Sequence, residues 1–320
     1  MQGRLSTPTP VSNRHVVPLG PLAVLDVNIW LDYFREDEPA ELEAQRARLR
    51  LATSRGLVRP MLTTSLSAEL AGTCEHMPYA AFCKMMLFAW EVCEERVLAN
   101  VHDRSEREIF WERKLTLEQA LVPLRARRHY REHQMLDREW SRQIAATVAA
   151  AMNDDHTDEH EKKRGTIEEL DAREVEQARE AAAANDGRII TPWRDAILAD
   201  DAARDALILD WALDEMVTVA MHTGLPFARA RLPDPRALPS FYLAKVVHVR
   251  RIHGVLLENR SPTNTDLFDL AALQDAACYA DIFATADTNL RKLAARVQVP
   301  LRVLDFEAWD DGLQEMLSGA

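Results

Sequence analysis

Four carboxylates lie far apart in the sequence, at places where the ends of separate elements could converge. Asp26 directly follows a short apolar run, and Asp287 follows a second one. Glu69 and Asp269 lie in segments with helical patterns. Carboxylates that are brought together repel one another, and hard divalent cations offset this repulsion by binding their oxygens. The pattern therefore indicates a pocket that binds Mg²⁺ or Mn²⁺. A site with two such ions about 3.5 to 4 Å apart could catalyse the hydrolysis of a phosphodiester.

The elements around these acids predict a parallel sheet. Short apolar runs indicate strands at residues 23–25, 57–62, 281–285 and 301–304. Because parallel strands need helical crossovers, the alternation of these runs with helical segments favours an α/β fold. Ligands of such sheets collect beyond the carboxyl ends of the strands, so Asp26 and Asp287 can lie in one crevice. Asp281 begins its strand instead, so we expect it roughly 15 Å or more from that crevice, in a structural role.

Length and composition indicate more than one lobe. At 320 residues, of which 47% are hydrophobic, the chain exceeds what one core usually fills. Residues 101–235 have the character of long charged helices, and we interpret them as a helical insertion. Residues 21–100 and 236–320 would then form one discontinuous catalytic domain. Residues 1–20 are rich in Pro, Ser and Thr, which predicts a loosely ordered lead-in.

The overall charge and the cysteines restrict the class of protein. Lys and Arg total 39 against 51 Asp and Glu, and the net charge of -12 would repel a polyanion unless metal ions or local basic patches intervene. The four cysteines show no Cys-x-x-Cys spacing and do not resemble a disulfide scaffold, which fits a cytoplasmic protein. No run of about 18 uncharged apolar residues occurs, so no membrane segment is expected.

One basic stretch could offset the acidic average near the predicted site. It contains Lys245, Arg250 and Arg251 and shortly precedes Asp266. Side chains of this kind can position a nucleic acid through its phosphates, and a salt-bridged helix face is the alternative. Residues 154–160 hold two histidines and four acids, but the run is continuous and lies beside Lys162, Lys163 and Arg164, so it is interpreted as a solvated linker rather than a zinc site.

Four segments, taken in order, resemble the acidic motifs of the PIN-domain ribonucleases, a family that includes VapC-type toxins. They are residues 24–28, residues 67–70, the helix that holds Asp269, and residues 285–287. Asp269 lies 16 residues before Thr285, which suits the third and fourth motifs of the family. The resemblance implies a Rossmann-like α/β/α sandwich, here interrupted by a helical insertion, and Mg²⁺- or Mn²⁺-dependent endoribonuclease activity. Compact toxins connect the second and third motifs far more briefly than the 200 positions found here.

The resemblance also assigns roles to individual residues. The four metal-binding acids would be Asp26, Glu69, Asp269 and Asp287. Asp266 is a secondary candidate for the metal, and Asn28 and Thr285 would orient the acids. The substrate would be RNA, and the helical insertion could bind a protein partner or an antitoxin. The sequence indicates no oligomeric state.

Each acid also has a simpler structural explanation. Asp26 and Asp287 can each cap a following helix. Glu69 can be an exposed residue of an amphipathic helix, for which Ser65 or Ser67 is the expected N-cap. Asp266 can cap its own helix, with Asp269 in a position like that of a capping box. Asp305 closes the last strand and is expected to cap the terminal helix.

Two other classes of function fit the same residues. A phosphatase of the haloacid dehalogenase class also places an aspartate after its first strand. Such enzymes typically have Asp-x-Asp, whereas Asn28 occupies the second position here. A non-enzymatic interaction protein would keep the α/β lobe as a scaffold and bind through its helices.

Overall fold

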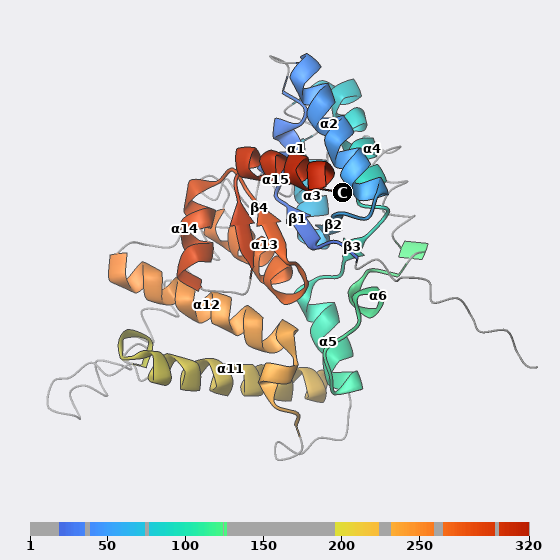
Figure 1. Cartoon of the computed structure of the whole chain (residues 1–320). Coiled ribbons are helices and arrows are strands. Elements are labelled where there is room, and N and C mark those ends of the chain that lie inside the picture. The colour runs from blue at the N-terminus through green and yellow to red at the C-terminus, as the bar shows by residue number, and fades with distance from the viewer. Residues whose placement is uncertain are drawn as a thin grey trace, which may run out of the picture.

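The computed structural model describes most of the α/β lobe and the helices that adjoin it (Figure 1). The described residues are 19–35, 39–73, 77–123, 125–126, 196–223, 232–258, 265–297 and 301–319. The predicted lead-in falls almost wholly outside them, as does the run at residues 154–160. No helix in the described ranges has the length and apolar character needed to span a membrane.

Five parallel strands form the sheet, in the order β3-β2-β1-β4-β5. The strands are β1 (Leu22–Leu25), β2 (Arg59–Thr63), β3 (Val97–Leu98), β4 (Ile282–Ala284) and β5 (Arg302–Leu304). This confirms the predicted α/β class and its parallel sheet. The four predicted strands are present with ends shifted by at most two residues. β3 escaped prediction because two residues are too short for a recognisable pattern.

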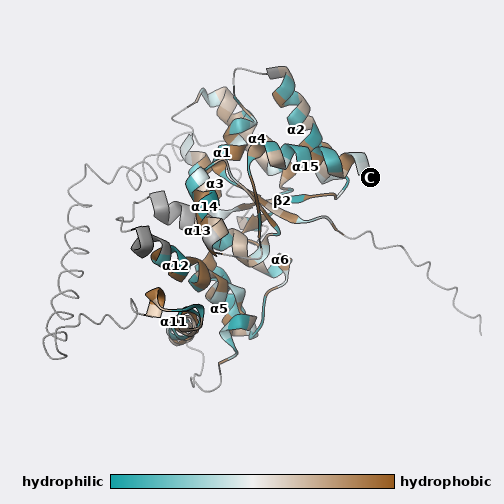
Figure 2. Ribbon diagram, turned by 60° about the vertical axis from the view of Figure 1, so that its left-hand side comes forward, coloured by the Kyte–Doolittle hydropathy of each residue, from teal (hydrophilic) through white to brown (hydrophobic). Residues whose placement is uncertain are grey.

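The helices are α1 (Val27–Asp32), α2 (Pro39–Ser54), α3 (Thr64–Gly72), α4 (Tyr79–Val92), α5 (Val101–Trp111), α6 (Leu117–Ala120), α11 (Asp201–His222), α12 (Pro239–Glu258), α13 (Thr265–Tyr279), α14 (Thr288–Val297) and α15 (Phe306–Gly319). A 3-10 turn, η3 (Pro235–Ala237), precedes α12. Helices α2 and α15 lie on one side of the sheet, and α13 and α14 lie on the other (Figure 2). Helix α12 packs on α13 and α14, and α11 packs on α12, so further helical layers extend from that side (Figure 1).

The central strand β1 is held between β2 and β4, and this pairing fixes the edge where the predicted site lies. Leu25 is the register partner of Ala284, and the backbone N–H of Asp26 donates to the Ala284 carbonyl at 2.9 Å. The strands β1 and β4 therefore end at the same level. Ala23, Val24 and Leu25 are fully buried, as expected for a parallel strand with both faces covered.

An aromatic cluster fixes the helix that follows Asp26. The indole N–H of Trp30 donates to the Leu25 carbonyl at 2.9 Å, and its ring meets Phe88 edge-on at 6.2 Å between centroids. Trp309 of α15 donates to the Tyr33 hydroxyl at 2.9 Å. Because these groups are buried and satisfied, α1 has little freedom to move relative to the end of β1.

The described part of the predicted insertion packs closely against the rest of the chain. Helices α5 and α11 contact each other, and both contact α12. Residues 127–195 and 224–231 lie outside the described residues, so the domain division itself stays a prediction.

Candidate functional site

Asp26 occupies the carboxyl end of β1 and serves as the N-cap of α1. Its Oδ1 accepts from the Val27 N–H at 2.9 Å, which confirms the simple capping explanation. Its Oδ2 accepts from the Thr285 hydroxyl at 2.7 Å and from the Asn28 amide at 3.4 Å. Only 6% of Asp26 is exposed. Asp26 can therefore cap α1 and also belong to a functional site, because its two carboxylate oxygens have different partners.

Thr285 and Asp287 lie beside Asp26 at the carboxyl end of β4. The Thr285 hydroxyl donates to Asp26 and accepts from the Asp287 N–H at 3.1 Å. Asp287 also caps α14, since its Oδ1 accepts from the N–H groups of Asn289 and Leu290 at 2.6 and 3.0 Å. The pairing of β1 with β4 thus brings together four predicted site residues from opposite ends of the sequence.

The electrostatics of this group favour a cation. Burial raises the pKa of Asp26, and the neighbouring charge of Asp287 raises it further, while hydrogen bonds from Thr285, Val27 and Asn28 lower it. A divalent ion would offset both the burial and the repulsion. Among the side chains that the structure describes, no group of three or more His, Cys, Asp or Glu could hold a metal ion.

Glu69 lies on α3, which contacts both α1 and the Asp269 helix α13. Its side chain is half-buried. The predicted N-cap of this helix was wrong. Thr63 is the cap, with its hydroxyl accepting from the Leu66 N–H at 3.1 Å, because α3 begins directly after β2 and both predicted serines already lie within the helix.

Asp266 and Asp269 belong to the first turns of α13, but their side chains lie outside the described ones. The end of α13 leads to Asp281, whose N–H donates to the Leu22 carbonyl at the amino end of β1. Helix α13 contacts β1, β2 and β4, so it runs back along the sheet. With 15 residues it spans about 22 Å. Its first turns are thus directed toward the same edge as Asp26, and the metal-binding role of both acids stays a prediction.

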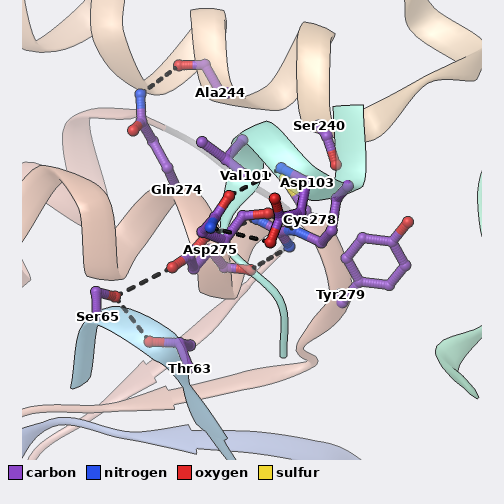
Figure 3. A network of polar contacts seen from close by, with 12 residues as sticks. Thr63, Ser65, Val101, Asp103, Ser240, Ala244, Gln274, Asp275, Cys278 and Tyr279 are labelled. Carbon is purple, nitrogen blue, oxygen red and sulfur yellow. Dashed lines mark hydrogen bonds and ion pairs between the residues drawn. The ribbon is translucent and has the colours of Figure 1, made fainter. Parts of the chain in front are cut away.

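Sequence reasoning missed a buried ion pair that lies at this edge. Arg104 of α5 is fully buried, and its Nη2 lies 2.6 Å from Oδ1 of Asp275 on α13. Oδ2 of Asp275 accepts from the Ser65 hydroxyl at 3.1 Å, and Ser65 lies 2.8 Å from the Thr63 hydroxyl. Figure 3 shows Thr63, Ser65 and Asp275 in a row from β2 to α13. The available signal was an aspartate in a mostly apolar helical run, since a buried charge needs a partner.

A second buried acid joins α5 to two further helices. Glu108 accepts from the Ser240 N–H at 2.9 Å, from the Ser240 hydroxyl at 3.0 Å and from the Tyr279 hydroxyl at 2.8 Å. Burial raises the pKa of Glu108, and these hydrogen bonds lower it. The Arg104 guanidinium lies 5.3 Å from the centre of the Tyr279 ring. Helices α5, α12 and α13 are therefore linked through one continuous polar cluster.

The Asp275 carboxyl should give the stability of the protein a measurable dependence on pH. Burial raises its pKa to about 6, although Arg104 and the hydrogen bond from Ser65 lower it. Between the ordinary value of 3.8 and about 6, the unfolded chain has lost this proton while the folded chain retains it. The contribution of Asp275 to the free energy of unfolding therefore decreases as pH rises through this range.

We expect the difference in unfolding free energy between wild type and Asp275→Asn to fall as pH rises from about 4 to 6, by up to about 1.4 kcal/mol per unit. Urea unfolding at several pH values measures it. A difference that stays constant or rises would contradict the assignment.

The predicted substrate-binding cations have partners within the protein. Lys245 lies 2.6 Å from Oε2 of Glu215 on α11, which confirms the salt-bridged alternative for this residue. Arg250 donates to the Val297 carbonyl at 2.7 Å. Arg251 is buried, with 7% exposed, which leaves little surface for a substrate contact. A role in substrate binding stays a prediction for the three.

The two acids that were expected to be structural are structural. Asp281 Oδ2 accepts from the Leu22 N–H at 2.8 Å, at the amino end of β1. Asp305 Oδ1 accepts from the Ala308 N–H at 2.9 Å and caps α15. Its other oxygen lies 2.7 Å from Arg291.

Comparison of the chain with protein-family models, with curated proteins and with solved structures finds no match.

Proposed function

We propose that this chain is a PIN-like endoribonuclease that depends on Mg²⁺ or Mn²⁺. One observation carries the proposal. The parallel pairing of β1 with β4 places Asp26, Asn28, Thr285 and Asp287 at one edge of the sheet, although 259 positions separate Asp26 from Thr285. Parallel sheets bind ligands at this edge. The order and context of the four acidic motifs support the family and the choice of RNA as substrate.

The residues of the site fit the chemistry of a hard divalent cation. Asp26 and Asp287 would hold the ion, together with Glu69 from α3 and Asp269 from α13, because carboxylate oxygens are its preferred ligands. When bound, such an ion would supply a water molecule of lowered pKa and would stabilise negative charge on the leaving oxygen of the phosphodiester. Thr285 and Asn28 hold Oδ2 of Asp26 by hydrogen bonds, which orients this carboxylate before any ligand arrives.

The proposal predicts cleavage of RNA that depends on added divalent metal. Purified protein should shorten total RNA in the presence of Mn²⁺ and leave it intact in EDTA, as read on a denaturing gel. The Asp281→Asn variant is the matched control, since Asp281 lies at the opposite end of the strands and its replacement should leave cleavage unchanged.

Intact RNA in the presence of Mn²⁺ and Mg²⁺ would contradict the proposal, as would cleavage that EDTA does not stop. Release of inorganic phosphate from small phosphoesters, with RNA intact, would favour a phosphatase instead.

A further inference from the structure

We propose that Asp275 positions the helices of Glu69 and Asp269 and thereby sets the affinity of the site for its divalent cation. Asp275 does so through its ion pair with Arg104 and its hydrogen bond from Ser65. This inference rests on the proposed function, because it concerns the same site. Asp275 and Arg104 do not touch the ion in this account. They act as positioning residues through the two helices.

The hydrogen bonds that end on Asp275 all run in one direction. The Ser65 hydroxyl donates to Oδ2 of Asp275, so it must accept from the Thr63 hydroxyl. The Thr63 hydroxyl in turn accepts from the Leu66 N–H in the first turn of α3. Bonds to an ionised acceptor are stronger than neutral ones, and a chain of bonds strengthens its members. The start of α3 is therefore fixed on α13 by a directional contact.

This contact lies on the face of α3 that carries the predicted ligand. Ser65 and Glu69 are four positions apart in the helix, which places both on one face. On α13, Asp269 precedes Asp275 by six positions, or about 9 Å along the helix. A displacement of α3 relative to α13 would therefore change the distance between the two predicted ligands.

The pair of Asp26 and Asp287 does not depend on this contact. Backbone bonds between β1 and β4 and the Thr285 hydroxyl hold these two acids in place. Loss of the Asp275 contact should then weaken the site without removing it. A weaker but saturable metal site is the expected signature.

Arg104 also holds α13 in place, from the helix α5 that follows strand β3. Helix α5 starts close after β3, with Asn100 as its N-cap. The Arg104 side chain donates to both Oδ1 and the carbonyl oxygen of Asp275, at 2.6 and 3.3 Å. Segments that follow β2 and β3 thus converge on one residue of α13. Two directional bonds from a rigid guanidinium restrict α13 more than apolar contacts of the same area would.

The test is Mn²⁺ binding to the Ser65→Ala variant, measured by isothermal titration calorimetry. Removal of groups that orient metal ligands typically weakens metal binding by about 10- to 100-fold. We expect about 10-fold weaker binding, with cleavage of RNA restored at saturating Mn²⁺. Ser65→Thr, which returns the hydroxyl, should regain the wild-type affinity.

The matched control is Ser105→Ala. Ser105 also lies near the N-terminus of its helix and is buried, but its hydroxyl donates only to the Val101 carbonyl of the same helix, at 2.7 Å, among the described contacts. Its replacement should leave Mn²⁺ affinity unchanged. Circular dichroism establishes that each variant is folded. If Ser65→Ala does not fold, the paired variant Arg104→Met/Asp275→Leu tests the same contact without leaving one member of the ion pair unpaired.

The possible results separate the two proposals. Wild-type affinity in folded Ser65→Ala would overturn the positioning role, whatever the activity. Mn²⁺ binding that weakens as expected, in a protein that does not cleave RNA, would support the positioning role and refute the ribonuclease. A wild type that binds no Mn²⁺ would refute both.

Discussion

Replacement of Asp26 by asparagine should abolish metal-dependent cleavage of RNA. The carboxamide has one fewer anionic oxygen and no charge, so it cannot serve as the central ligand of a hard cation. We expect cleavage to fall by more than about 100-fold, beyond the loss typical of residues that only orient a ligand. The same change should leave the fold intact, because the asparagine oxygen can still accept from the Val27 N–H. Initial rates on a defined RNA at saturating Mn²⁺ measure the effect.

The stability of Asp26→Asn gives an independent check. Burial raises the pKa of Asp26, so the ionised form of this carboxyl is penalised in the folded protein. The free energy of unfolding of the variant should therefore equal or exceed that of wild type. A loss of activity together with a loss of stability would indicate that Asp26 is structural.

Asp305→Asn is the matched control for this experiment. Asp305 also closes a parallel strand and also caps the helix that follows, but it lies on the edge strand β5 and pairs with Arg291. An asparagine retains the capping oxygen, so cleavage should be unchanged. Equal rates of RNA cleavage by Asp26→Asn and wild type, with both proteins folded, would contradict the assignment of the site.

The parts of the fold that could be predicted are those that depend on local sequence. The central strands β1 and β4 are short apolar runs, because both faces of a covered parallel strand are buried. The acid that follows such a run must lie at the carboxyl edge, which is why Asp26 and Asp287 could be placed together. Thr285 was placed with them by resemblance, and its bond to Asp26 is now visible. For Asp266 and Asp269, the structure shows the helix that carries them and the edge of the sheet toward which its first turns are directed, but it does not describe their side chains.

The parts that could not be predicted depend on partners far away in the sequence. Arg104 lies in a charged helix, where a cation usually faces water, and its partner Asp275 is 171 positions later. Glu108 has the same property, since its partners are on α12 and α13. Nothing in the local pattern of α5 distinguishes these residues from exposed ones. For Lys245 the local pattern indicated a surface cation that could bind a substrate, but the structure pairs it with Glu215 of another helix.

The Arg104→Ala variant should be among the least stable single variants of the described lobe. Removal of one partner of a buried ion pair leaves the other charge uncompensated, which costs about 3 to 5 kcal/mol. Here the stranded group would be the Asp275 carboxyl, of which 5% of the side chain is exposed. Because Arg104 lowers the pKa of Asp275, its loss raises that pKa, and part of the cost is the uptake of a proton. Urea unfolding followed by circular dichroism should show a corresponding fall in the free energy of unfolding at pH 7.

The paired variant Arg104→Met/Asp275→Leu should lose far less stability than Arg104→Ala. Apolar residues of similar volume remove both charges of the pair, and such replacements are often neutral, although Glu108 also loses the nearby Arg104 charge that lowers its pKa. Its free energy of unfolding should therefore lie within about 1 to 2 kcal/mol of that of wild type. The remaining loss would come from the Ser65 hydroxyl, which no longer has Asp275 as its acceptor. Equal losses in the single and the paired variant would show that packing, rather than charge, accounts for the effect. A stable paired variant with weakened Mn²⁺ binding would mean that the ion pair is kept for the geometry of the site rather than for stability.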